Sequence, residues 1–195
     1  MHNINTNKNF QITKGNWDIV SLEGVDEKTG TLYYNSSEIS PLDRNIFTIK
    51  LDGSQKKNLT PENGWHDAYF SEGFEYFMQK YSFINEPPRY SICSKDGKEI
   101  RVLKENKSLR AKMKEYDLSK LELIQAPNAD GVMLHGWIIR PNNFDDKKQY
   151  PLLIDQYSGP GSQEVKNQFS GRDFWWYQML AQKGYIIACF DGTGT

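Results

Sequence analysis

The stretch Tyr150-Pro-Leu-Leu-Ile-Asp-Gln-Tyr-Ser-Gly-Pro-Gly-Ser-Gln163 decides the fold of the last part of the chain. Its apolar run, Pro151 to Ile154, stands between turn-forming residues and predicts a fully buried strand. We expect the strand to end at Asp155, and the glycines and proline that follow predict a turn. Tyr157 is then placed just beyond the carboxyl end of the strand.

A second apolar run, Tyr185 to Phe190, follows and ends in Asp191-Gly-Thr-Gly194. The segment between the two runs, 174–183, has helical periodicity and stops at Gly184, a residue that suits a helix C-terminus. Strand, helix and strand in this order predict a βαβ unit of a parallel sheet. Ligands bind beyond the carboxyl ends of the strands in such sheets, which is the position expected for Tyr157.

Residues 10–104 are rich in aromatic residues and predict short strands in two similar halves. Tyr33-Tyr34 recurs as Tyr76-Phe77, 43 positions later, and Asp52-Gly53 recurs as Asp96-Gly97, 44 positions later. A period near 44 residues with about four strands is typical of β-propeller blades, and a β-sandwich with accidental similarity is the alternative. Two blades do not close a ring, so we expect an incomplete propeller whose other blades precede Met1 in a longer parent protein.

Three regions follow from these patterns. Residues 1–104 are expected to be the last blades of a β-propeller. Residues 105–120 are charged and predict a helical connector with Leu109, Met113 and Tyr116 on one side, capped by Asn106 or Ser108. Residues 121–195 predict a strand hairpin and then the βαβ unit, which is how an α/β-hydrolase domain begins.

Composition limits the classes of function. A net charge of −1 disfavours nucleic acid and anionic membranes as partners. No apolar run approaches the ~20 residues of a membrane span, and no signal peptide is visible. The three histidines lack the spacing of zinc ligands, so neither metal nor cofactor is expected. Cys93 and Cys189 are expected to be buried free thiols, with a disulfide between two different modules as the alternative.

An ordered set of motifs resembles the dipeptidyl peptidase IV branch of the prolyl oligopeptidase family of serine peptidases, from about Phe10 to the end of the chain. The motifs that carry the resemblance are Gly15-Asn-Trp17, Gly24-Val-Asp-Glu-Lys28, Tyr33 to Ser37, Glu38-Ile-Ser-Pro-Leu-Asp-Arg44, Ala129-Asp-Gly131, Leu134-His-Gly-Trp137, Pro141, Tyr150-Pro-Leu-Leu153, Tyr157-Ser-Gly-Pro160, Ser162-Gln163, Ala181-Gln-Lys-Gly-Tyr185 and Asp191-Gly192. The resemblance implies an N-terminal β-propeller before a C-terminal α/β-hydrolase domain.

The resemblance also indicates which catalytic parts this chain lacks. The sequence contains no Gly-x-Ser-x-Gly nucleophile motif. In the family that motif, and then the acid and histidine of the triad, come after the position of Thr195, and the glutamates that hold the substrate amino terminus come before Met1. We therefore expect a fragment that is inactive alone. Thr193 replaces the usual arginine of the Asp-Gly-Arg-Gly motif, which puts a salt bridge of that arginine in doubt.

Tyr157 is the catalytic candidate. The tyrosine at this position of the family's Tyr-x-Gly-Pro motif donates its hydroxyl to the oxyanion of the tetrahedral intermediate, and such preorganised donors are what that intermediate needs. Read without the family, a tyrosine that packs at a strand end is the alternative.

The other residues that could carry chemistry are expected to be structural. Neither Ser158 nor Ser162 lies in a nucleophile motif or next to a histidine. Trp175 to Tyr177 are expected to form the buried and flanking side of the helix, with an aromatic substrate platform as the alternative. The remaining structural candidates are Asp155, His66 and His135. Arg44 and Arg89 stand at equivalent positions of the two halves, which predicts a role repeated in each blade.

The resemblance implies a parent that removes dipeptides with Pro or Ala second from peptide amino termini by Ser-His-Asp acyl-enzyme chemistry. A catalytically inactive binding protein and a related tripeptidyl or acylaminoacyl peptidase are the alternatives. The expected partner is a peptide substrate; nucleic acid and membrane contact are not expected from this chain, and the parent is compatible with a homodimer. The family context suggests a secreted, periplasmic or membrane-anchored protein.

Overall fold

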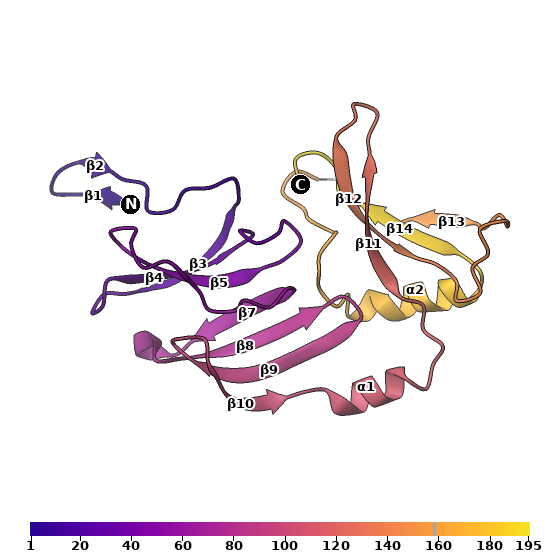
Figure 1. Cartoon of the computed structure of the whole chain (residues 1–195), viewed down its shortest axis with the longest axis horizontal. Helices are drawn as coiled ribbons and strands as arrows, with labels where there is room; N and C mark the ends of the chain where they lie inside the picture. Colours follow the sequence, from indigo (N-terminus) through magenta and orange to yellow (C-terminus); the bar gives the residue numbers. More distant parts are fainter. Residues whose placement is uncertain (158) are drawn as a thin grey trace. The chain divides into compact units, whose positions relative to one another are not determined.

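The computed structural model describes residues 1–157 and 159–195, without the side chains of Asn3 and Arg172. The chain divides into two compact units: residues 1–81 with 89–105, and residues 82–88 with 106–195 (Figure 1). Each unit is described separately. Among the described residues, none of the helices combines the length and apolar character required to cross a membrane.

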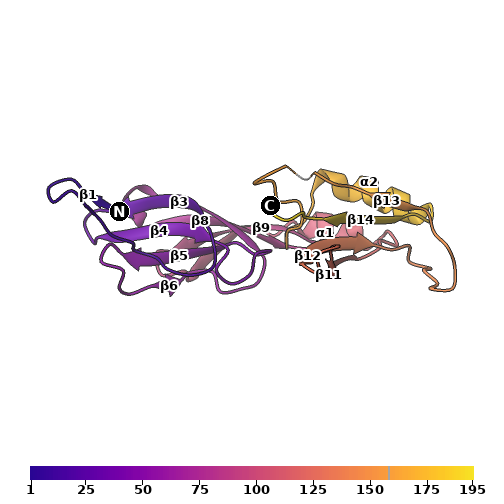
Figure 2. The ribbon, with the colours of Figure 1, turned by 90° about the horizontal axis from the view of Figure 1, so that it is seen from above.

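The first unit contains two four-stranded sheets and a small N-terminal hairpin. The hairpin pairs β1 (His2–Asn3) with β2 (Lys8–Asn9). The first sheet has the order β3 (Ile19–Asp26), β4 (Thr31–Ser36), β5 (Asn45–Lys50) and β6 (Lys57–Asn58), all antiparallel (Figure 2).

The second sheet repeats this order with β7 (Trp65–Phe70), β8 (Tyr76–Phe83), β9 (Glu86–Ser94) and β10 (Glu99–Lys104). A short 3-10 turn, η1 (Glu72–Phe74), connects β7 and β8. The tip of the β8–β9 hairpin, residues 82–88, groups with the second unit. Two sheets of four strands, each joined to its neighbour in the chain, are what the repeat of 43–44 residues predicted.

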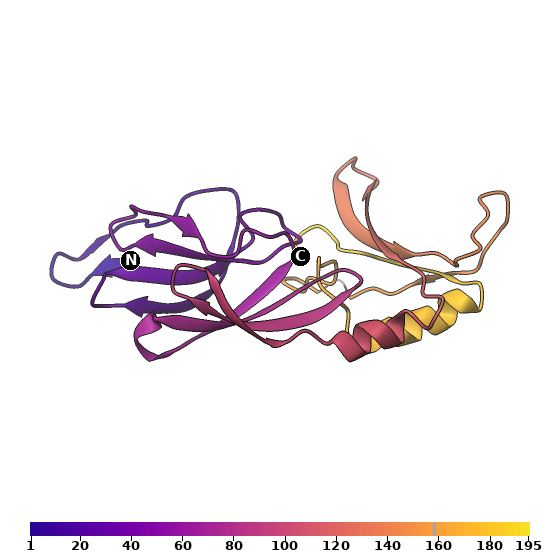
Figure 3. The ribbon, with the colours of Figure 1, turned by 60° about the horizontal axis from the view of Figure 1, so that its bottom comes forward.

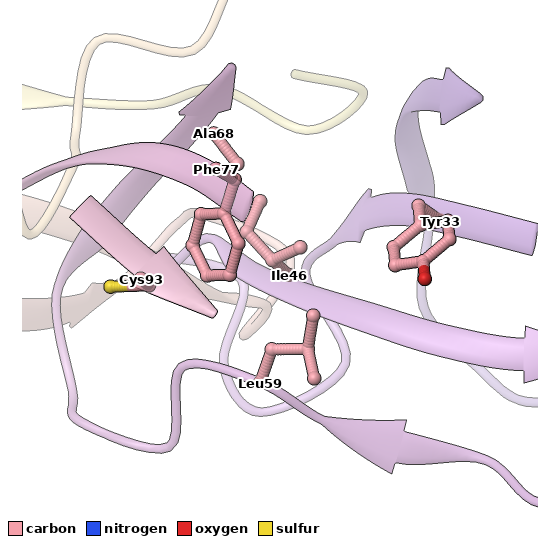
Figure 4. Packing of buried hydrophobic residues seen from close by; sticks show 6 residues of the cluster. All are labelled: Tyr33, Ile46, Leu59, Ala68, Phe77 and Cys93. Carbon is pink, nitrogen blue, oxygen red and sulfur yellow. The ribbon is translucent and has the colours of Figure 1, made fainter. Parts of the chain in front are cut away.

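The repeat is confirmed at the level of side chains. The aromatic pairs occupy the second strand of each sheet, β4 and β8, and the two Asp-Gly turns follow the third strands, β5 and β9. Tyr34 faces Trp17 on one side of the first sheet, whereas Phe77 of the second sheet faces the first. The core between the sheets consists of Tyr33, Ile46, Leu59, Ala68, Phe77 and Cys93 (Figure 4).

The two arginines do not share a role, so the expectation of a repeated function was wrong. Arg44 is buried, lies 4.6 Å from the centre of the Trp65 ring, and donates to the carbonyl oxygens of residues 41 and 43. Arg89 is half-buried and forms an ion pair with Glu99 at 2.6 Å. The two positions differ in their backbone setting, because Arg44 precedes its strand and donates to the loop before it, while Arg89 lies within a paired strand.

The second unit is a mixed sheet with a helix on one face. Its strand order is β11 (Leu121–Pro127), β12 (Met133–Ile139), β14 (Ile186–Phe190) and β13 (Leu152–Ile154). Strands β11, β12 and β14 are antiparallel neighbours, and β13 runs parallel to β14. The predicted hairpin and the βαβ unit are both present.

The helix α2 (Arg172–Gln182) connects β13 and β14 and packs on the sheet through one face. Its buried residues Phe174, Tyr177, Gln178 and Ala181 have the spacing of one helical stripe. The helix ends in a Schellman motif, because Gly184 donates to the carbonyl of residue 181 and Tyr185 to that of residue 180. Gly184 has a φ of 87°, which explains why a glycine stands there.

The connector is shorter than the sequence suggested. The helix α1 covers only Lys107–Met113, and Asn106, although it occupies the N-cap position, makes no capping hydrogen bond through its side chain. Its amide instead donates to the carbonyl of Pro88 at 2.6 Å. Beyond the end of α1 (Figure 3), the Tyr116 ring meets the Trp175 ring of α2 edge-on, with 6.2 Å between centroids.

The expectation that the strand 151–154 is fully buried was wrong. In the described part of the chain, β13 is the last strand of its sheet, and Leu152 and Ile154 are 58% and 48% exposed. Leu153 pairs with Ile187, which is fully buried, so its two neighbours point to the opposite face of the sheet. A short apolar run alone does not distinguish an edge strand from a central one.

Candidate active site

Two carboxylates follow the two parallel strands. Asp155 comes directly after β13 and Asp191 directly after β14. The backbone N–H of Asp155 donates to the carbonyl of Ala188 at 2.9 Å, so the parallel ladder continues to the end of β13. Because the strands are parallel neighbours, both carboxylates lie at the same edge of the sheet.

The Asp155 carboxylate is tied to the helix. Tyr177 of α2 donates its hydroxyl to Asp155 Oδ2. The Tyr177 ring is buried and packs against Trp137 of β12, with 5.1 Å between the ring centroids. Burial first, and the hydrogen bond to the carboxylate second, raise the pKa of Tyr177, so the phenol stays protonated as a donor.

The Asp191 carboxylate fixes the loop that follows Tyr157. Its Oδ1 accepts from the backbone N–H of Glu164 at 2.9 Å, and its Oδ2 from that of Val165 at 3.0 Å. Asp191 is 9% exposed and Val165 is fully buried. A buried carboxylate that accepts two backbone hydrogen bonds is a strong fixed point for a loop.

Tyr157 itself projects from this edge. It is 66% exposed, and its ring lies so close to Gly159 that an added Cβ there would approach it to 3.3 Å. Ser162 Oγ lies 2.6 Å from the carbonyl oxygen of Gly159 and 3.3 Å from that of Tyr157, so this hydroxyl closes the turn. Gly161 donates to the carbonyl of Gly194 at 3.4 Å, which links the turn to the segment after β14.

A cavity of about 210 Å³ lies beside Tyr157 within the second unit. Residues of the sheet, of α2 and of the loop 164–170 line it. Three carboxylates, those of Asp155, Glu164 and Asp173, line it together with the cationic Lys166. Tyr157 therefore lines a polar cavity, and it lies beyond the carboxyl end of a parallel strand, the position that the sequence predicted.

Three of the other candidates, Ser162, His66 and His135, make contacts that suit structural roles. Ser162 binds backbone carbonyls, and Ser158 lies outside the described residues. His66 is fully buried, with its ring nitrogens 2.8 Å from the carbonyl of Glu62 and 2.7 Å from the amide of Gln79. His135 contacts Gln125 at 3.2 Å.

The described residues contain no group of three or more His, Cys, Asp or Glu side chains suited to a metal ion. Both cysteines are buried and free, which confirms that expectation. Burial, followed by the nearby carboxylates, raises the pKa of Cys189 to about 12, so this thiol stays protonated.

The sequence did not reveal the two anchors of the site. The sequence predicts a buried and flanking role for Trp175 to Tyr177 together, and in the structure Tyr177 is the buried member while the two tryptophans are 40% and 49% exposed; the contact of Tyr177 with Asp155 was not predicted. The available signal was its position three residues after the buried Phe174, which puts both on one helix face. For Asp191 the signal was its position directly after an apolar strand.

Comparison with known proteins supports the resemblance. Residues 1–88 match the family described as the dipeptidyl peptidase IV N-terminal region. The chain is 35% identical over 193 residues to the probable dipeptidyl-aminopeptidase B of Arthroderma otae, covering 96% of this chain and 21% of the relative. It is 36% identical to that of Botryotinia fuckeliana, covering 94% of this chain and 20% of the relative.

The fold matches as well. The crystal structure of Porphyromonas gingivalis dipeptidyl peptidase 4 aligns with a TM-score of 0.90 and 37% identity, over 98% of this chain and 27% of that one. The chain spans about a fifth of the length of the curated relatives. By sequence and by fold, the chain resembles part of the proteins of the dipeptidyl peptidase IV family.

Proposed function

We propose that this chain is part of a serine exopeptidase that removes dipeptides, with Pro or Ala second, from the amino termini of peptides. Resemblance to the dipeptidyl peptidase IV family supports a dipeptidyl aminopeptidase. The observation that carries the proposal is Tyr157: its side chain is exposed at the carboxyl end of a parallel strand, beside a cavity, within the sequence Tyr157-Ser-Gly-Pro160.

In this proposal the first unit supplies blades of a β-propeller and the second begins the catalytic domain. Residues 1–104 are the C-terminal blades, 105–120 the connector and 121–195 the start of an α/β-hydrolase domain. The two stacked four-stranded sheets support the propeller assignment. The βαβ unit, with α2 on the face of the sheet that carries Trp137, supports the second assignment.

Tyr157 would act as an oxyanion donor. When a serine attacks a peptide carbonyl, negative charge develops on the carbonyl oxygen, and a hydroxyl that is fixed in advance stabilises it. The nucleophile, the histidine and the acid would come from other parts of the whole protein. The Tyr157 hydroxyl would strengthen its hydrogen bond as the charge grows, so it acts on the transition state more than on substrate binding.

The test is Tyr157→Phe in the whole protein, assayed with a Gly-Pro chromogenic amide. We expect kcat to fall by ~10²–10³-fold with little change in KM. Tyr150→Phe is the matched control: Tyr150 also carries a hydrogen-bonded hydroxyl, 2.8 Å from the backbone N of Asp145, but it precedes β13 instead of following it. The 195-residue chain alone should show no turnover.

Three results would contradict the proposal. Near-normal kcat in Tyr157→Phe would leave Tyr157 a structural residue. Loss of activity that only follows unfolding, seen as a lowered melting temperature, would have the same meaning. A well-folded whole protein without any peptidase activity would favour an inactive binding protein.

A further inference from the structure

Tyr157 follows the end of one strand and precedes a loop fastened to the end of the next. Residues 155–157 leave β13 at Asp155, whose carboxylate accepts the Tyr177 hydroxyl. Residues 159–165 return along the segment after β14, where Asp191 accepts two backbone N–H groups. The exposed tyrosine thus lies between two anchors, each built on a strand-end carboxylate.

We propose that Tyr177, acting through Asp155, and Asp191 are positioning residues that clamp the two sides of the Tyr157 turn and aim its hydroxyl. This inference rests on the proposed function and adds two residues to it. Neither residue touches the reacting atoms; each acts on the backbone that carries Tyr157.

The physical need for the clamp follows from the exposure of Tyr157. Its side chain is 66% exposed, so few side-chain contacts hold it and its direction depends on the backbone from which it projects. An oxyanion donor must be placed to within a fraction of an ångström, because misplacement by about 1 Å costs up to ~10²-fold in rate. The anchors are suited to this task because Tyr177 and Val165 are buried in the unit, at 7% and 0% exposure.

The first experiment measures the clamp without any activity. Amide hydrogen exchange in the 195-residue chain should speed up by roughly tenfold at Asp155 in Tyr177→Phe. The amide keeps its bond to the Ala188 carbonyl, but the end of β13 loses the side-chain hydrogen bond that stabilises it locally. In Asp191→Asn the amides of Glu164 and Val165 should exchange faster, because an amide oxygen replaces only one of the two carboxylate acceptors. Tyr150→Phe should leave all three amides unchanged. Unchanged exchange in both anchor variants would overturn the clamp.

The second experiment uses the whole protein and the Gly-Pro amide assay. Tyr177→Phe should lower kcat roughly tenfold, less than removal of the Tyr157 hydroxyl itself, and leave KM nearly unchanged. In a Tyr157→Phe background the same substitution should have no further effect on kcat, because there is no hydroxyl left to aim. A decrease of the same size in both backgrounds would show that Tyr177 acts independently of Tyr157 and would overturn the inference.

The two experiments separate the inference from the function on which it rests. If Tyr157→Phe keeps a normal kcat, the proposed function fails, whatever the exchange rates show. If Tyr157→Phe loses activity as expected but Tyr177→Phe and Asp191→Asn keep normal kcat, the function stands and the positioning roles fail.

Discussion

Gln178 offers a quantitative test of how the second unit is held together. This side chain of α2 is 2% exposed; its Oε1 accepts from the backbone N of Ser119 at 2.7 Å and its Nε2 donates to the Ser119 carbonyl at 2.8 Å. The side-chain amide thus pairs with the backbone N–H and C=O of Ser119 as a neighbouring strand would. Ser119 is 3% exposed, so these two groups have little access to water.

We expect Gln178→Leu to lower the free energy of unfolding by about 2–6 kcal/mol, because it leaves two buried groups of Ser119 unpaired and each costs about 1–3 kcal/mol. Leucine is close to glutamine in size, so the cavity contribution should be small. The measurement is urea unfolding of the 195-residue chain, followed by tryptophan fluorescence at a concentration where sedimentation shows a monomer.

The matched control is Gln125→Leu, since Gln125 is an exposed glutamine whose contact is with His135 at 3.2 Å. That change should stay within about 0.5 kcal/mol. A loss below 1 kcal/mol for Gln178→Leu would refute the reasoning, because it would mean that Ser119 finds other partners at little cost.

Three further predictions concern pH, backbone strain and association. Burial lowers the pKa of His66 below its value in the unfolded chain, so the unfolded state binds the proton first and the free energy of unfolding should fall as the pH drops below about 6.5. Urea midpoints between pH 7.5 and pH 5 (roughly the range over which histidine titrates) should show this loss, and His66→Gln but not His135→Gln should remove it. Gly97→Ala should destabilise the chain by about 1–3 kcal/mol more than Gly30→Ala in thermal melts. Both glycines have a positive φ, but only at Gly97 would the added Cβ meet a backbone oxygen, that of Leu59, at 2.3 Å. Ile154 is half-exposed on an edge strand, so it should promote self-association of the isolated chain. Ile154→Lys should reduce this association in sedimentation velocity, and equal association of the two chains would contradict the prediction.

Much of the fold could be predicted because it follows from local patterns. Alternation of apolar residues and the two Asp-Gly turns fix the hairpins, and Gly184 ends α2 where the sequence placed the end. The position of Tyr157 followed from its place after an apolar strand. These features depend on neighbours along the chain, and a single sequence shows those directly.

The contacts that hold the site together could not be predicted, because they join residues far apart in the chain. Tyr177 meets Asp155 only because α2 turns one particular face to the sheet. Asn85, at the tip of a hairpin where polar residues are usually solvated, exchanges two hydrogen bonds with the backbone of Leu121 at 2.9 and 3.0 Å. The exposure of β13 depends on which strands pair with it, and the composition of a short apolar strand does not indicate its neighbours.

The stacking of the two sheets in the first unit shows that the two faces of each sheet have different roles. Tyr34 and Ile49 of the first sheet face Trp17, and their counterparts Phe77 and Cys93 of the second sheet face the first sheet. In both sheets, equivalent positions thus face the part of the chain that comes earlier in the sequence. Tyr33 fills the opposite side and contacts the second sheet, whereas its counterpart Tyr76 is 52% exposed. The two faces of each sheet therefore carry different side chains and are not interchangeable. Sheets of this kind therefore stack in one orientation, with the first face of each against the second face of the sheet before it. A further sheet inserted into the stack by design would have to keep that orientation to bury its apolar face.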